Sequence, residues 1–190
     1  MIKPGRLFVI SAPSGAGKTT LCEKLLNELP DIVRSVSLTT RKIRKGEIRG
    51  KDYYFTSVEA FKKKIKNKEF LEYARVFGNY YGSPRKFVEK NIQKNKDVIL
   101  NIDVQGAMQI KKTFKHNSTF IFILPPTLKD LKKRLLKRKT DTKKQIQARL
   151  DVAKNELKYL KYYDFQIVND DIKTAFKQLK SIVIAMRAKV

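Results

Sequence analysis

Three consecutive residues near the N-terminus, Gly17, Lys18 and Thr19, are of the types that hold a nucleotide phosphate. A lysine that ends a glycine-containing loop neutralises the β and γ phosphates, and the hydroxyl that follows it binds Mg²⁺. The tripeptide alone is common by chance, so its position carries the argument. It stands between an apolar run at 7–11 and a helical pattern at 20–29. Strand, loop and helix in this order form a phosphate-binding unit, because the helix N-terminus adds its own N–H donors.

We refer to residues 12–19 as the phosphate loop. It predicts an ATP site in which backbone N–H groups face phosphate oxygens. Ala12 stands where the usual pattern has glycine, which is acceptable if that residue has a negative φ. The residues expected to bind ATP are Ser14, Gly15, Ala16, Gly17, Lys18, Thr19 and Thr20, and Thr19 is the expected ligand of Mg²⁺.

The elements that must position this loop alternate between strand and helix. Apolar runs predict strands at 98–102, 119–124 and 165–168, and periodic leucines predict helices after Thr127, over 146–160 and after Asp171. Such alternation predicts a parallel sheet covered by helices. The segment 35–83 is instead polar and rich in tyrosine, and it predicts a small, mostly β lobe with one helix begun by Ser57.

Composition limits the class of protein. The 190 residues suffice for one globular domain with a small inserted lobe, and the single cysteine, Cys22, excludes an internal disulfide. The apolar runs are too short to span a bilayer, so we expect a cytoplasmic protein with no membrane partner. The net charge of +25 leaves two interpretations open: binding of a polyanion, or lysine-rich solvated faces.

Several further segments together resemble the guanylate kinase family, over about residues 7–170. They are Ser35–Arg44, Gly46-Glu47, Gly50–Phe55, Glu69–Glu72, Gly78–Ser83, Ile102–Gly106 and Arg138–Thr142. The resemblance implies an α/β P-loop nucleoside-monophosphate kinase that transfers a phosphoryl group from ATP to GMP or dGMP with Mg²⁺. It also implies a core (1–34, 97–136 and 150–190), a GMP-binding lobe (35–96) and a helical lid (137–149).

The resemblance assigns the acceptor site residue by residue. Arg41, Arg44, Tyr53 and Tyr81 are expected around the GMP phosphate, where guanidinium groups supply fixed donors to a dianion. Glu72 and Asp103 are expected against the guanine edge, with Ser37 and Ser83 nearby. A carboxylate suits guanine because that edge presents two adjacent donors, whereas adenine presents an acceptor at N1.

Further residues are expected on the donor side and in the lid. By resemblance, Arg134, Arg138 and Arg149 stabilise the transferring phosphate, and Asn169 and Asp170 lie on the adenine side. The chain departs from the family pattern at four positions, namely Ala12, Ile43, Asn101 and Lys139.

Other classes of function stay open at this point. A non-catalytic guanylate-kinase-like module that binds proteins would tend to lack the phosphate loop or the lid arginines, and both are present. A nucleic-acid-binding protein would need a basic tract with aromatic platforms, and the aromatics cluster elsewhere. We expect nucleic acid not to be required, the small-molecule partners to be GMP and ATP, and the chain to be a monomer or a homodimer.

Overall fold

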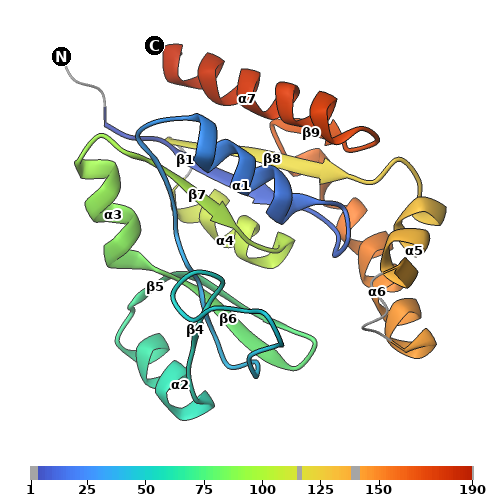
Figure 1. The fold of residues 1–190 in the computed structure, drawn as a ribbon. Helices are drawn as coiled ribbons and strands as arrows, with labels where there is room; N and C mark the ends of the chain where they lie inside the picture. The colour runs from blue at the N-terminus through green and yellow to red at the C-terminus, as the bar shows by residue number, and fades with distance from the viewer. Residues whose placement is uncertain (1–3, 115–116, 138–141, 190) are drawn as a thin grey trace. The chain divides into compact units, whose positions relative to one another are not determined.

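The computed structural model describes residues 4–114, 117–137 and 142–189. The chain divides into two compact units. The first comprises the residues up to Leu7, Asp31–Leu100 and Gln105–Ser118; the second comprises Phe8–Pro30, Asn101–Val104 and the residues from Thr119 onward. Each element belongs to the unit that holds most of its residues. Figure 1 labels the elements and colours them along the chain.

The first unit is built on a four-stranded sheet with the order β4-β3-β6-β5, in which β3–β6 and β6–β5 are antiparallel and β3–β4 is parallel. This unit also holds the parallel pair β2–β7. Its elements are β2 (Ile32–Arg34), β3 (Leu38–Thr39), β4 (Tyr54–Phe55), α2 (Val58–Lys66), β5 (Phe70–Val76), β6 (Asn79–Pro84), α3 (Arg85–Gln93), β7 (Asp97–Asn101) and α4 (Val104–Thr113).

The second unit carries the parallel pair β8–β9 and the phosphate loop. Helices α1 and α7 pack against each other, α7 contacts β9, and α5 packs on α6. Its elements are β1 (Leu7–Ser11), α1 (Lys18–Glu28), β8 (Ser118–Leu124), α5 (Leu128–Lys137), α6 (Lys143–Leu157), a 3₁₀ turn (Leu160–Tyr162), β9 (Phe165–Val168) and α7 (Ile172–Ala188). Strands β2, β7, β1, β8 and β9 follow one another in that order in a five-stranded sheet.

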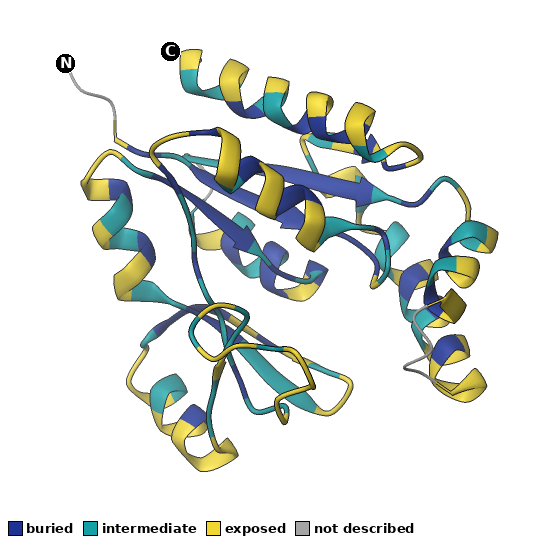
Figure 2. Cartoon of the chain, viewed as in Figure 1, coloured by how far each residue is buried: buried dark blue, intermediate teal, exposed yellow. Residues whose placement is uncertain are grey.

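The predicted alternation of strand and helix is confirmed, and its physical basis is burial. Strand β1 is completely buried, and Figure 2 shows β7 and β8 mostly dark, whereas the helices are striped. A strand covered on both faces must be apolar throughout, whereas a surface helix needs only one apolar face. The parallel sheet and the separate, mixed small sheet therefore agree with the predicted fold class.

Local capping explains where several helices begin. Ser57 Oγ accepts from Ala60 N at 3.1 Å, Thr127 Oγ1 accepts from Asp130 N at 3.0 Å, and Asp171 Oδ1 accepts from Thr174 N at 2.8 Å, all as predicted. The helix predicted over 146–160 instead runs from Lys143 to Leu157. It begins earlier because Thr142 and Gln145 form a capping box, which satisfies N–H groups of the first turn.

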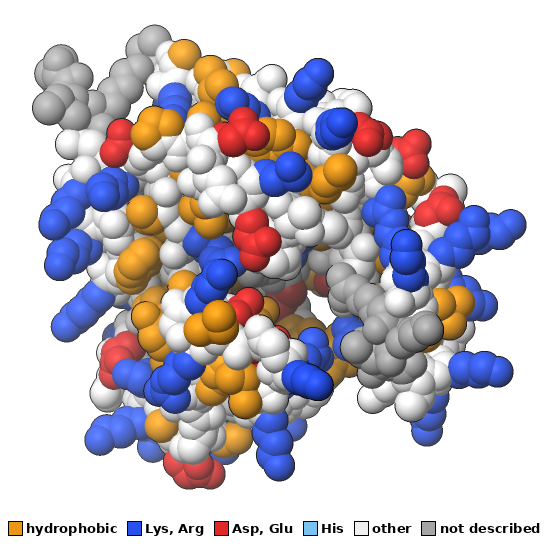
Figure 3. All heavy atoms as spheres, viewed as in Figure 1, with side chains coloured by type: hydrophobic (Ala, Val, Ile, Leu, Met, Phe, Trp, Pro, Cys, Tyr) orange, Lys and Arg blue, Asp and Glu red, His pale blue; other side chains and the backbone are white. Residues whose placement is uncertain are grey.

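Lysine and arginine side chains are spread over several elements on the face drawn in Figure 3. Much of this charge lies in helices with one buried and one solvated side, such as α2 with a buried Phe61 and exposed lysines. The distribution favours the interpretation of lysine-rich solvated faces. No helix within the described residues has the length and apolar content needed to cross a membrane.

Candidate functional site

The phosphate loop leads from the buried strand β1 into α1. Gly15 and Gly17 have φ of 102° and 95°, a region that residues with a Cβ rarely adopt, whereas Ala12 is not among the described residues with positive φ. The condition for an alanine at position 12 is therefore met. Gly17 caps α1, and its carbonyl accepts from Leu21 N at 3.2 Å. Gly17 offers no side-chain cap to this turn, and the N-terminus of a helix provides N–H donors that suit an anion.

Close packing is a second reason for glycine in the loop. A Cβ on Gly15 would lie 3.1 to 3.2 Å from Leu135 and Leu131 of α5, and a Cβ on Gly17 would overlap the Asn169 side-chain amide. That amide donates to the Ala16 carbonyl at 2.7 Å. The loop is therefore held from outside, and its shape does not depend on glycine flexibility alone.

Other polar side chains of the second unit converge on this loop. Lys18 Nζ donates to the Ile102 carbonyl at 3.0 Å, and Thr19 and Thr20 are exposed in the first turn of α1. Arg149 of α6 donates to Ser14 Oγ at 2.9 Å, and Arg134 of α5 donates to the Asn169 carbonyl at 2.7 Å. Arg134 and Arg149, two of the three arginines expected to stabilise the transferring phosphate, thus contact a loop residue or the residue that holds the loop. Arg138 lies outside the described residues, as does Lys139.

Sequence reasoning missed Glu156, a half-buried carboxyl of α6. Burial raises its pKa to about 7, the positive charge of Lys18 lowers it, and the negative charge of Asp103 raises it. Tyr163 is close by, and its pKa is raised by burial above all. A glutamate three residues after a buried alanine has no signal of its own in one sequence, because its neighbours come from other segments.

We predict that Glu156→Gln is more stable than the unmodified protein at pH 8, and by a clearly smaller margin at pH 5. A carboxyl whose folded pKa exceeds its unfolded value stabilises the fold below the unfolded pKa. It loses that contribution as the pH rises through the folded pKa, here between about 4.5 and 7. Glutamine mimics the protonated form, so we expect a gain of about 1 to 3 kcal/mol at pH 8. Thermal unfolding at the two pH values measures it.

The matched control for this prediction is Glu23→Gln, an exposed glutamate on α1. It is expected to unfold at the same temperature as the unmodified protein at both pH values. An equal effect of Glu156→Gln at pH 5 and pH 8 would show that the carboxyl does not titrate in this range.

In the first unit, three predicted phosphate ligands lie together. The guanidinium of Arg41 is 5.4 Å from the centre of the Tyr53 ring, and the Tyr53 and Tyr81 rings are 5.8 Å apart in an edge-to-face arrangement. Burial, then the neighbouring Tyr81, raises the pKa of Tyr53, so its phenol stays a neutral donor at physiological pH. Arg44 has an exposed side chain, and its backbone N–H donates to Glu47 Oε2 at 2.8 Å.

Glu47 is a partner of this cluster that sequence reasoning did not assign. It accepts two hydrogen bonds from Arg41, at 2.7 Å to Oε1 and 3.1 Å to Oε2. Burial opposes ionisation of Glu47, but the hydrogen bonds from Arg41 and from Arg44 N outweigh it and lower the pKa. A bidentate contact fixes the plane of a guanidinium, so Glu47 orients Arg41. An Arg and a Glu six residues apart would have been the only signal.

The predicted base-binding residues of the first unit are also adjacent. Glu72 on β5 is only 4% exposed, and its Oε1 accepts from Ser83 Oγ on β6 at 2.6 Å, since these two residues are paired across the sheet. A buried carboxylate is stabilised by hydrogen-bond donors, so a ligand that brings donors suits this position. Ser37 is half-buried just before β3. Asp103 belongs to the second unit.

A resident metal centre finds no support in the described part of the chain, where no group of three or more His, Cys, Asp or Glu residues could hold an ion. The phosphate loop instead fits a Mg²⁺ ion that arrives with the nucleotide and takes few ligands from the protein. Thr19 offers one exposed hydroxyl next to the anion cradle, and Mg²⁺ commonly takes one or two protein oxygens together with phosphates and waters.

Comparison with known proteins agrees with this geometry. The family model described as guanylate kinase matches residues 4–186. A guanylate kinase of Caldanaerobacter subterraneus subsp. tengcongensis is 44% identical over 99% of this chain and 91% of its own length. One of Protochlamydia amoebophila is 48% identical over 96% of this chain and 92% of its own.

A solved structure is similar over the whole fold. The crystal structure of guanylate kinase from Anaplasma phagocytophilum has a TM-score of 0.85 and 39% identity, and the match covers all of this chain and 90% of the other. The phosphate loop, the arginine–tyrosine cluster and the buried carboxylate thus occur in a chain that matches one family from end to end. The chain belongs to the guanylate kinase family.

Proposed function

We infer that this protein transfers the terminal phosphoryl group of ATP to GMP and so forms GDP and ADP. The observation that carries the inference is the presence of two complementary sites in one chain. One is a glycine-containing phosphate loop with Lys18, and the other is a lobe with an arginine–tyrosine cluster beside a buried glutamate. The first suits a nucleoside triphosphate, and the second suits a purine monophosphate.

We propose that the GMP phosphate binds to Arg41, Arg44, Tyr53 and Tyr81. The bidentate contact with Glu47 supports this role for Arg41, because it holds the guanidinium in one orientation before the ligand arrives. The two phenols add neutral donors without electrostatic competition. A dianion gains more from such charge-assisted hydrogen bonds than from neutral ones.

We propose that Glu72 recognises guanine, with Ser83, Ser37 and Asp103 in support. Ser83 occupies one oxygen of the carboxylate from one side and so fixes its rotation. Guanine N1–H and the exocyclic amine then meet two acceptors. Adenine would bring its N1 lone pair toward a buried negative charge, which is expensive when unpaired.

On the donor side, we propose that the loop backbone of Gly15, Ala16 and Gly17 binds the ATP phosphates together with Ser14 and Thr20. Lys18 neutralises the β and γ phosphates, and Asn169 belongs to this side through its hold on the loop. Thr19 would hold Mg²⁺, which when bound neutralises phosphate charge during transfer.

The chemistry needs no general base, because an ionised phosphate of GMP is already the nucleophile. The side chains of the protein position the two nucleotides and stabilise charge that spreads over the transferring group. We propose this second task for Arg134, Arg138 and Arg149. The contacts of Arg134 and Arg149 around the loop support it. Exclusion of water from such a site limits wasteful hydrolysis of ATP.

We further propose a functional division into a core (1–34, 97–136 and 150–190), a GMP-binding lobe (35–96) and a lid (137–149). We also propose that the enzyme acts in the cytoplasm on free nucleotides, as a monomer or a homodimer, without nucleic acid or membrane.

The experiment that tests the proposed function measures ADP release from ATP and Mg²⁺ with GMP, dGMP, AMP, CMP or UMP offered separately. We expect rapid release with the two guanine nucleotides and a rate lower by about 10⁴-fold with the others. Folded protein that binds GMP but releases no ADP with any acceptor would contradict catalysis and favour a protein-binding module. Equal rates with GMP and AMP would contradict the assignment of the base site.

A further inference from the structure

The strand that carries Glu72 lies at an edge of its sheet. In the order β4-β3-β6-β5, only one side of β5 is paired with another strand. The backbone N–H and C=O groups on the other side of an edge strand need partners from elsewhere. Edge strands are also the part of a sheet in which register and position are least constrained.

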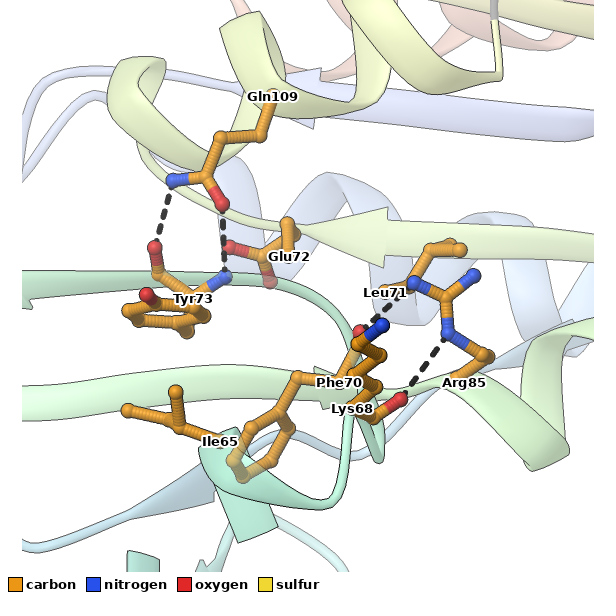
Figure 4. A pocket seen from close by; sticks show the side chains of 8 residues that line it. All are labelled: Ile65, Lys68, Phe70, Leu71, Glu72, Tyr73, Arg85 and Gln109. Atoms are coloured by element: carbon orange, nitrogen blue, oxygen red, sulfur yellow. Dashed lines mark hydrogen bonds between the residues drawn. The ribbon is translucent and has the colours of Figure 1, made fainter. Parts of the chain in front are cut away.

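A side chain supplies such a partner beside Glu72. Tyr73 N donates to Gln109 Oε1 at 3.2 Å, and Gln109 Nε2 donates to the Tyr73 carbonyl at 2.6 Å (Figure 4). One amide on α4 thus takes the place of a neighbouring strand at a single residue. The geometry is selective, since only a side chain with one donor and one acceptor at its tip can pair with both backbone groups.

The preceding part of β5 is held by a second side chain. Arg85 Nη2 donates to the Phe70 carbonyl at 3.1 Å, and Arg85 Nε donates to the Lys68 carbonyl at 3.2 Å. Gln109 and Arg85 therefore bind the strand on either side of Glu72, as Figure 4 shows.

The need for this support follows from the strand itself. The pairing of β5 with β6 shifts between Phe70 and Glu72, so the regular ladder is interrupted just before the carboxylate. Such irregularities re-aim the side chains that follow them. A buried carboxylate that must meet two donors of a base tolerates little displacement, because an error of about 1 Å can cost roughly 10²-fold.

We propose that Gln109 is a positioning residue for base recognition, which fixes the backbone at Tyr73 and thereby the Glu72 carboxylate. The proposal rests on the assignment of Glu72 to guanine. A hollow of about 270 Å³ along β5 is lined by Glu72 together with Gln109 and Arg85. The two supporting side chains therefore lie on the same hollow as the carboxylate.

The test is Gln109→Met, which keeps the length of the side chain and removes both hydrogen bonds. We expect the KM for GMP to rise by about 10- to 100-fold, by analogy with the loss of a hydrogen-bond partner that orients a metal ligand. The KM for ATP and kcat at saturating GMP should stay within about twofold. The preference for GMP over IMP, which lacks the exocyclic amine, should fall by a similar factor to the KM effect. A merely stabilising residue would not alter that preference.

Gln93→Met is the matched control, because Gln93 is an exposed glutamine at the end of α3. It should leave both KM values and the preference for GMP over IMP unchanged. Gln109→Glu is a second variant of almost the same shape. Its carboxylate can still accept from Tyr73 N but repels the Tyr73 carbonyl, so we expect the same loss of preference.

Two outcomes separate this proposal from the assignment on which it rests. If Glu72→Gln lowers the preference for GMP over IMP and a folded Gln109→Met does not, the positioning role is wrong and the base site stands. If Glu72→Gln leaves the preference unchanged, the base site itself is wrong. If neither Gln109 variant folds, amide hydrogen exchange of the unmodified protein tests whether Gln109 holds the backbone at Tyr73. A Tyr73 amide protected far beyond that of Arg75 supports the contact, and equal rapid exchange overturns it.

Discussion

Replacement of Lys18 by methionine is expected to lower kcat by about 10³-fold or more, while the KM for GMP changes by less than about threefold. Lys18 ends the phosphate loop, and its ammonium group lies against the Ile102 carbonyl at 3.0 Å. On the proposed assignment, this cation binds the β and γ phosphates of ATP, where negative charge redistributes during transfer. Methionine keeps the length of the side chain and removes only the charge and its donors. The acceptor cluster around Arg41 belongs to the other compact unit and keeps its own contacts.

Steady-state kinetics with GMP varied at saturating ATP, together with direct GMP binding by calorimetry, separate these two effects. Lys24→Met is the matched control, because Lys24 lies on the same helix with an exposed side chain. It should retain kcat within about twofold. A Lys18→Met enzyme with the kcat of the unmodified protein would rule out the assignment of this lysine to the transferred phosphate. A variant that lost GMP binding to the same degree would instead indicate a general loss of structure.

Replacement of Glu72 by glutamine is the second change with a large expected effect, this time on the choice of acceptor. We expect kcat/KM for GMP to fall by about 10² to 10⁴-fold, because glutamine offers guanine one acceptor in place of two and turns a donor toward another donor. The rate with AMP should fall less or rise. Ser83 Oγ can still donate to the side-chain oxygen, so the fold at this position is kept.

The measurement is kcat/KM for GMP, IMP and AMP with the same batch of folded protein. Glu69→Gln is the control, because Glu69 lies just before β5 and its partly exposed side chain pairs with Lys64 at 2.7 Å. The control should keep the order of acceptors. An unchanged ratio of GMP to AMP in Glu72→Gln would mean that another group reads the base, and Asp103 would then be the first to test.

Three of the four positions that depart from the family pattern lie within the described residues, and their environments differ. Ala12 is buried and has no positive φ, so the missing glycine is accommodated. Ile43 is 54% exposed in the segment between Arg41 and Arg44, where it packs little. The family commonly has a proline at this position, which would stiffen the segment. Here Glu47 accepts hydrogen bonds from the Arg41 side chain and from Arg44 N, and so links the two ends of the segment. Asn101 is half-buried at the end of β7.

The sequence by itself determined the elements and the chemistry that local pattern encodes. A short apolar run followed by turn residues favours a strand covered on both faces, and β1 is such a strand. Gly17-Lys18-Thr19 between strand and helix defines a phosphate loop for the same local reason. The caps at Ser57, Thr127 and Asp171 were predictable because a cap and its N–H partner lie three residues apart. The specific motifs of the acceptor lobe indicated the guanylate kinase family.

The tertiary structure alone decided which side chains support the site residues. Gln109 pairs with Tyr73 from 36 residues away, Asn169 holds the Ala16 carbonyl from 153 residues away, and Glu156 shares its surroundings with Lys18. No local pattern marks such residues, because a supporting contact depends on where two distant segments meet and not on the type of either neighbour in sequence. Burial, which raises the pKa of Glu156 and encloses Glu72, is likewise a property of the packed chain. The sequence therefore determined what chemistry is possible, and packing decided how firmly each group is held for it.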